Sequence, residues 1–163
     1  RMKTRRPPTF RPVRYCRSAH RYFHDPGHRW LIGEALPDMI LRDMSDPVAR
    51  PIPGTGVDPA SVFFSPDGQW VGFANVSASL LQKIEVTGGS PLTLCKFDNS
   101  PPYGASWTGN SIFFATPAGI LRVSENGGEP EVLVKTTGAA EQAYGPQMLD
   151  DEWLLFTLPN TAA

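Results

Sequence analysis

Hydrophobic and polar positions recur along this chain with a period of about 41 residues. Segments 64–73, 106–114 and 148–156 each consist of an apolar stretch, a short polar turn and a second apolar stretch. Matching positions in these segments, at intervals of 41 and 42 residues, are Val71, Ile112 and Leu154, and two residues later Phe73, Phe114 and Phe156. A fixed period of this length, kept over two steps, predicts a repeat architecture.

The second half of each unit recurs as well. Segments 81–95 and 120–134 each contain an alternating stretch, a Gly-Gly pair, a proline and a short apolar stretch. An earlier copy, 39–52, has Ser-Asp-Pro in place of Gly-Gly. Gly-Gly between alternating stretches predicts a β-hairpin, because glycine adopts positive φ without steric cost. The strands expected in the clearest unit lie at about 61–64, 70–74, 81–86 and 92–95.

Four-stranded units with this period are typical of β-propeller blades. We therefore predict an all-β fold, a partial β-propeller of about three four-stranded antiparallel blades preceded by a disordered or irregular basic segment. The predicted divisions are a basic tail at 1–21 and propeller blades over 22–163, namely a degenerate or partial blade at 22–53, blades at 61–96 and 104–135, and half a blade at 145–157. An irregular β-sandwich with evenly spaced turns is the alternative.

A propeller closes with four to eight blades, so one with this number of units is open. Open strand edges invite pairing with other strands. We therefore expect the edges to be covered by the remaining blades of a longer parent chain or by self-association.

Most of the candidate functional positions in this chain are turn residues with structural roles. Pro66 sets φ near −65°, Asp67 can bond to the local backbone, and Gly68 supplies a positive φ, so the chain reverses between two strands. The corresponding turn glycines in the other hairpins are Gly88, Gly89, Gly109, Gly127 and Gly128. We predict no catalytic role for Asp67.

Four segments carry a resemblance to a known family: 49–55 (Ala-Arg-Pro-Ile-Pro-Gly-Thr), 63–73 with its Phe-Ser-Pro-Asp-Gly turn, 89–95 and 104–107. The chain resembles, over about 39–157, the TolB-like six-bladed β-propeller, with WD40-like Pro-Asp repeats, that many bacterial receptor-type serine/threonine protein kinases carry after a transmembrane helix. TolB itself and the propellers of prolyl oligopeptidase-family enzymes share the Phe-Ser-Pro-Asp-Gly turn. The resemblance implies a location on the extracytoplasmic side of a bacterial membrane.

Charge is divided unevenly along the 163 residues. Residues 1–30 contain nine Lys or Arg and one Asp, a net charge of +8, whereas the rest of the chain has a net charge of −9. This basic segment could bind nucleic acid or another polyanion electrostatically. Because no recognised nucleic-acid module follows it, we do not expect nucleic acid as the partner.

Motifs for phosphoryl transfer and serine hydrolysis are missing. The chain has no Gly-rich phosphate loop, no His-Arg-Asp catalytic loop, no Asp-Phe-Gly and no Gly-x-Ser-x-Gly. We therefore predict that this chain is not an enzyme and has no catalytic or cofactor-binding residues, whatever activity a parent protein has.

One group of residues has metal-ligand character. Cys16, His20, His24 and His28 are spaced four apart, which would place them on one face of a helix. Pro26-Gly27 would interrupt that helix before the last ligand. We treat the four as weak candidates and predict no metal site. Two cysteines, Cys16 and Cys95, allow one disulfide at most.

These observations together predict a non-enzymatic β-propeller interaction or sensing module within a larger bacterial serine/threonine protein kinase, with a protein or peptide partner on a propeller face. The alternatives are the propeller portion of a prolyl oligopeptidase-like hydrolase or of a TolB-type periplasmic protein, or polyanion binding through the basic segment. No apolar run approaches the roughly 18–20 residues of a membrane span.

Overall fold

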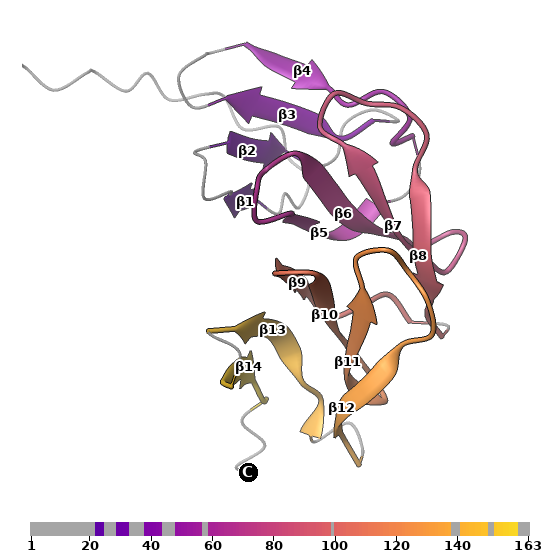
Figure 1. Ribbon diagram of the computed structural model, residues 1–163, viewed down its shortest axis with the longest axis vertical. Helices are drawn as coiled ribbons and strands as arrows, with labels where there is room; N and C mark the ends of the chain where they lie inside the picture. Colours follow the sequence, from indigo (N-terminus) through magenta and orange to yellow (C-terminus); the bar gives the residue numbers. More distant parts are fainter. Residues whose placement is uncertain are drawn as a thin grey trace, which may run out of the picture.

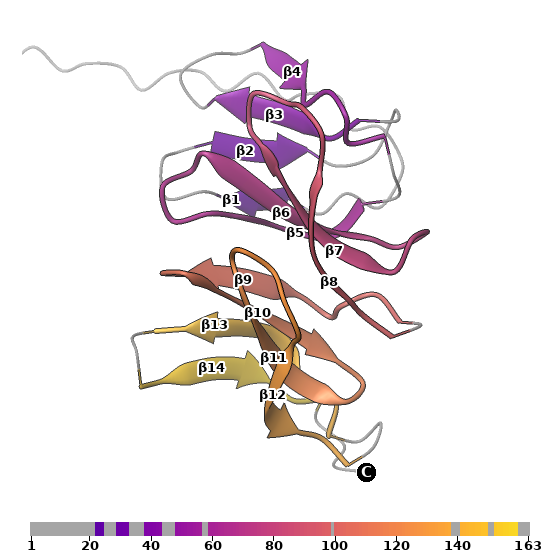
Figure 2. The same ribbon diagram turned by 45° about the vertical axis from the view of Figure 1, so that its right-hand side comes forward.

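The computed structural model describes residues 22–24, 29–32, 38–43, 48–56, 59–98, 100–137, 141–149 and 152–159. All regular elements in this part of the chain are β-strands. They form three four-stranded antiparallel sheets and a two-stranded one, and strand order within each sheet follows the sequence. Figure 2 shows the sheets stacked one after another as propeller blades. The predicted fold class, an all-β partial propeller, is confirmed.

The strands of the first blade are β1 (Tyr22–His24), β2 (Arg29–Ile32), β3 (Ile40–Asp43) and β4 (Ala49–Pro51). Those of the second are β5 (Pro59–Phe64), β6 (Trp70–Asn75), β7 (Leu80–Glu85) and β8 (Leu92–Lys96). The third blade contains β9 (Ala105–Thr108), β10 (Ser111–Thr116), β11 (Gly119–Ser124) and β12 (Glu131–Lys135). A half blade follows, made of β13 (Tyr144–Met148) and β14 (Leu154–Thr157).

The blades fan out so that their first strands lie inside and their last strands outside (Figure 1). We call β1, β5, β9 and β13 the inner strands and β4, β8 and β12 the outer strands. The predicted disordered tail, 1–21, lies outside the described residues. Among the described residues, no helical segment has the length and hydrophobicity that spanning a bilayer requires.

The hydrophobic core lies between blades rather than within one sheet. Alternate residues of a strand point to opposite faces, and both faces of the second blade are covered. Val71 and Phe73 pack toward the first blade, whereas Ala74 and Leu81 pack toward the third. This two-sided burial explains why the middle strands are apolar at nearly every position.

One packing position is filled from different strands in successive blades. Phe63 on β5 pairs with Gly72 on β6, and a Cβ on Gly72 would lie 2.1 Å from the Phe63 ring. At the matching pair in the third blade the ring comes from β10, because Phe113 pairs with Ser106. The two pairs place one aromatic ring and one small residue side by side in both blades.

A positive φ recurs at the start of the inner strands. Ser61, Gly104 and Gly145 have φ values of 49°, 111° and 56° and occupy matching positions of three units. The Ser61 hydroxyl donates a hydrogen bond to the Pro102 carbonyl, and the Gly145 N–H donates one to the Tyr103 carbonyl at 2.9 Å. Neighbouring inner strands are therefore joined at these bends.

Candidate interaction surface

The turn between β5 and β6 is held by a compact network of hydrogen bonds. The Ser65 hydroxyl donates to Asp67 Oδ1 at 2.5 Å, and the Gln69 N–H donates to the same oxygen at 3.0 Å. The Trp70 N–H in turn donates to Ser65 Oγ at 2.9 Å. The hydrogen bond from Ser65, and then that from Gln69, lower the pKa of Asp67, because they stabilise the carboxylate. Gly68 in this turn has a φ of +67°.

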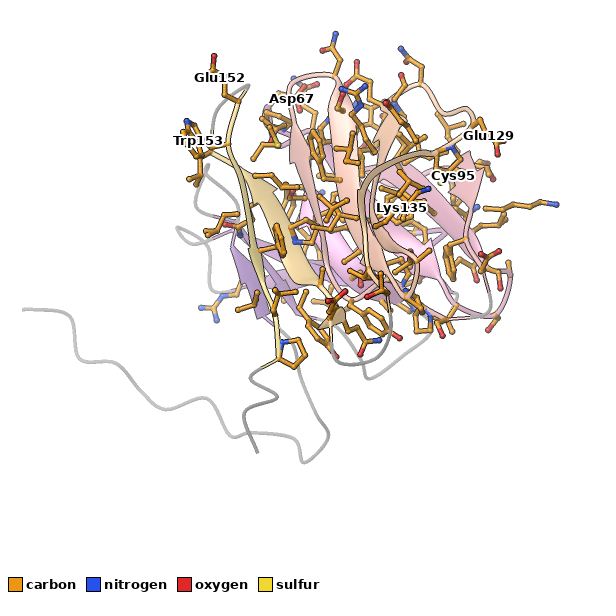
Figure 3. The ribbon with its side chains drawn as sticks, turned by 90° about the horizontal axis from the view of Figure 1, so that it is seen from below. Asp67, Cys95, Glu129, Lys135, Glu152 and Trp153 are labelled. Carbon is orange, nitrogen blue, oxygen red and sulfur yellow. The ribbon has the colours of Figure 1, made fainter. Side chains whose placement is uncertain are left out.

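Turns of several blades gather on one side of the stack, where strands of each blade end (Figure 3). Because strand direction alternates within a blade, the turn after the first strand and the turn after the third lie at the same end. Asp67, Glu129 and Glu152 lie along the upper side of Figure 3. The described turns at this end (65–69, 85–91, 109–110, 124–130, 149 and 152–153) contain no Lys or Arg, and their carboxylates are Asp67, Glu85, Glu125, Glu129 and Glu152. We call this surface the acidic end.

The Gly-Gly turns lie at this end and also join the blades. The Gly89 N–H donates to the Pro53 carbonyl of the first blade at 3.2 Å. One period later, the Gly128 N–H donates to the Leu94 carbonyl of the second blade at 2.9 Å. A Cβ on Gly127 would lie 2.8 Å from that same Leu94 oxygen. Each turn therefore docks on the preceding blade. The sequence analysis missed this contact, although Pro53 and Leu94 are 41 residues apart, which is one period of the repeat.

Lys83 also joins two blades. Its Nζ lies 4.7 Å from the centre of the Trp70 ring and 5.4 Å from that of Trp107 on the next blade. Trp107 meets Phe63 edge to face at 6.3 Å, and its Nε1 donates to the carbonyl of the turn residue Gly109 at 3.0 Å. A cation between two indole faces stabilises their packing. These side chains are therefore occupied with holding the second and third blades together.

The weak metal candidates are not brought together by anything in the described structure. Cys16, His20 and His28 lie outside the described residues, and His24 is the last residue of β1. Within the described ranges, no group of three His, Cys, Asp or Glu residues could hold a metal ion. The basic segment that suggested polyanion binding also lies largely outside them.

Cys95 is a free, buried thiol at the joint between the second and third blades. Burial, and then the negative charge of Glu129, raise the pKa of this thiol to about 11. Glu129 and Cys95 are labelled on the same side of the molecule in Figure 3. The folded protein therefore keeps this thiol protonated well above the pH at which an exposed cysteine ionises.

We expect Cys95 to make the protein lose stability in alkali. An ordinary thiol ionises near pH 9.0, so below that pH the thiol is protonated in both states and stability is intact; as pH rises toward about 11, the unfolded state is increasingly favoured. Urea unfolding at about pH 8 and about pH 10.5 measures the loss. A Cys95→Ala variant should lose less stability between the two pH values, and an equal loss in both proteins would contradict the assignment.

No protein-family model matches this chain, and no curated protein matches it either. Solved structures share its fold. One from a nidogen/laminin complex has a TM-score of 0.64 at 13% identity, covering 81% of this chain and 52% of that one. A gluconolactonase from Xanthomonas campestris has a TM-score of 0.61 at 10% identity, covering 77% and 48%. A virginiamycin B lyase from Staphylococcus aureus has a TM-score of 0.61 at 19% identity, covering 84% and 47%.

The likeness to these proteins shows the fold, a β-propeller. The chain spans about half the length of each of the three structures. The broad part of the family resemblance, a propeller, is thus confirmed, whereas the narrower TolB-like and kinase-linked assignments stay predictions.

The prediction that this chain is not an enzyme is wrong. It depended on the absence of protein kinase and serine hydrolase motifs, but a gluconolactonase and a lyase have the same fold. Missing motifs of two reaction classes exclude only those two classes, because one fold hosts many chemistries. A catalytic site built from side chains of separate blades would leave no local sequence motif.

Proposed function

We propose that this chain is part of a TolB-like propeller that serves as a sensing and partner-binding module of a larger bacterial receptor-type serine/threonine protein kinase. The observation that supports this most directly is the position of the residues that carry the family resemblance. Pro53 and Gly54 contact the Gly88-Gly89 turn, and Leu94 contacts the Gly127-Gly128 turn. Two of the four segments that carry the resemblance, 49–55 and 89–95, therefore contain residues that build the blade joints.

The acidic end is the surface proposed to meet a protein or peptide partner. Residues that build the joints are engaged by neighbouring blades, whereas Gln69, Asn110 and Glu129 are exposed on turns of two different blades. Loops presented on a rigid scaffold commonly carry binding function. The described turns of this surface contain carboxylates and no Lys or Arg, so their charge is negative. Added positive charge should therefore change partner binding strongly.

The coding sequence around this segment gives the first test. A kinase domain and a membrane span upstream support the proposal, whereas a Gly-x-Ser-x-Gly domain downstream would favour a prolyl oligopeptidase-like hydrolase instead. This observation separates the two parents before any assay is made.

Charge variants of the whole protein give the second test. We expect Gln69→Lys, Asn110→Lys and Glu129→Lys together to reduce the stimulated autophosphorylation of the kinase several-fold, since they place positive charge on the acidic end. Phosphorylation assays in membranes measure this effect.

A matched control places the same change of charge on the opposite side of the stack, at the other ends of the strands. Ser77, Asp98 and Ala118 are exposed there, and Lys at these three positions should leave autophosphorylation unchanged. Equal losses in the two triple variants, with both proteins folded by circular dichroism, would contradict a binding role for the acidic end.

A further inference from the structure

The Gly-Gly turns of the second and third blades share a backbone hydrogen bond but differ at one side chain. In each turn the N–H of the first glycine, Gly88 or Gly127, donates to the carbonyl three residues earlier at 2.9 Å. The residue before that glycine is Thr87 in the second blade and Asn126 in the third. An amide side chain therefore stands in one turn where the other has a hydroxyl.

Asn126 and Gly127 form the one Asn-Gly pair in the 163 residues. Glycine has no side chain, so its backbone nitrogen can approach the side-chain amide of the asparagine before it. Asn126 is exposed, so water reaches the same amide. Asn110 is also exposed on a turn, but Ser111 follows it, and a serine side chain hinders this approach more than glycine does. Of these two asparagines, Asn126 has the neighbour that favours attack.

The reaction that this pair permits is loss of ammonia from the asparagine side chain. The backbone nitrogen of Gly127 bonds to the side-chain carbonyl carbon of Asn126, the bond from that carbon to Nδ2 breaks, and a succinimide ring closes. The proton that the backbone nitrogen loses passes through solvent to Nδ2, which leaves as ammonia. Water then opens the ring at either carbonyl, giving aspartate or isoaspartate. Water is the one co-reactant, and nothing is oxidised or reduced.

The folded turn restrains this reaction. The Gly127 nitrogen is engaged with the Ser124 carbonyl, and the Gly128 N–H donates to the Leu94 carbonyl of the second blade at 2.9 Å. The Asn126 N–H also donates to Ser124 Oγ at 3.2 Å. Ring closure therefore requires the turn to open, and opening one exposed turn costs much less free energy than unfolding the whole chain.

Isoaspartate at position 126 would lengthen the backbone where the turn meets the second blade. In isoaspartate the chain runs through the side-chain carbon, which adds one main-chain atom just before Gly127. Space there is already tight, since a Cβ on Gly127 would lie 2.8 Å from the Leu94 oxygen. The new carboxylate also adds negative charge between Glu125 and Glu129. Both changes disfavour the docked turn.

We propose that Asn126 is a site of spontaneous deamidation, and that its isoaspartyl product releases the Gly-Gly turn of the third blade from the second. The modification weakens one joint irreversibly and leaves the matching joint, whose turn has Thr87, intact. Cys95, 6% exposed at the weakened joint, then becomes accessible. This inference rests on the blade joints and is independent of the kinase-linked proposal.

The test ages the folded chain in mildly alkaline buffer and follows two readouts. A Cys16→Ser form is used, in which Cys95 is the single thiol. Peptide mapping by mass spectrometry should show aspartate and isoaspartate at position 126 several-fold sooner than at Asn110. A thiol reagent should label Cys95 several-fold faster in aged protein than in fresh protein. Asn126→Thr, which copies the turn of the second blade, should keep Cys95 protected throughout.

Asn126→Asp separates the effect of charge from that of the longer backbone. It supplies the carboxylate without the additional main-chain atom, so the fresh variant should label Cys95 at close to the rate of the fresh parent. Survival of Asn126 for as long as Asn110, or isoaspartate without faster labelling, would overturn the proposal. Equally fast labelling of aged Asn126→Thr would overturn it too, because the joint would then open for another reason. Fast labelling of fresh Asn126→Asp would contradict the role of the lengthened backbone.

Discussion

Replacing Phe114 by alanine is expected to lower the free energy of unfolding by about 3–5 kcal/mol, as for other fully buried aromatic residues. Phe114 is fully buried, and it lies in the cluster that joins the second and third blades. Removing its ring leaves a cavity between two sheets whose strands are fixed by pairing on both sides, so the site cannot collapse easily. Urea unfolding followed by tryptophan fluorescence measures the change.

Phe156 provides a matched control, because it occupies the same position of the half blade. It is only partly buried, against Ala115, Ile120 and their neighbours. Phe156→Ala should therefore cost clearly less than Phe114→Ala. If the two substitutions cost the same, the core does not lie between blades in the way described.

The positions of the core residues were predictable because they follow from two periods. The period of two within a strand decides which side chains share a face, and the period of about 41 aligns those faces in successive blades. Val71 and Ile112, matched from sequence alone, each pack toward the preceding blade in the structure. No long-range information beyond the repeat was needed.

The bend at Ser61 could not be predicted in this way. Glycine at matching positions 104 and 145 suggests a bend there, but serine rarely adopts positive φ. In the structure the Ser61 hydroxyl is bonded to the carbonyl of Pro102, which belongs to the loop leading into the next blade. A strained position that depends on a contact 41 residues away leaves no local pattern.

The candidate site was less predictable than the fold. Gly88-Gly89 and Gly127-Gly128 were expected as hairpin turns, which describes their local geometry but not the blade on which each turn docks. The acidic end likewise combines turns from the second, third and half blades, so its charge is spread over short segments far apart in the sequence. A motif search likewise reads only local sequence, so missing motifs led to the wrong conclusion on enzymatic activity.

Gly54→Ala is expected to destabilise the protein by about 2–5 kcal/mol, the combined cost of backbone strain and overpacking. Gly54 has a φ of +93°, which L side chains rarely adopt. A Cβ there would also lie 2.1 Å from the Gly89 carbonyl oxygen. That oxygen belongs to the backbone of a docked turn, so relief of the clash requires the first and second blades to move apart. Urea and thermal unfolding both report the loss.

Gly109→Ala separates the effect of the joint from that of positive φ. Gly109 has a φ of +55°, and a Cβ there would meet nothing within 4 Å. Its substitution should cost only about 1–2 kcal/mol, the penalty for a left-handed residue with a side chain. A larger loss for Gly54→Ala than for Gly109→Ala shows that close contact between blades, beyond turn geometry, stabilises the stack. Equal losses would mean that the Gly-Gly turn of the second blade contributes nothing by docking on the first.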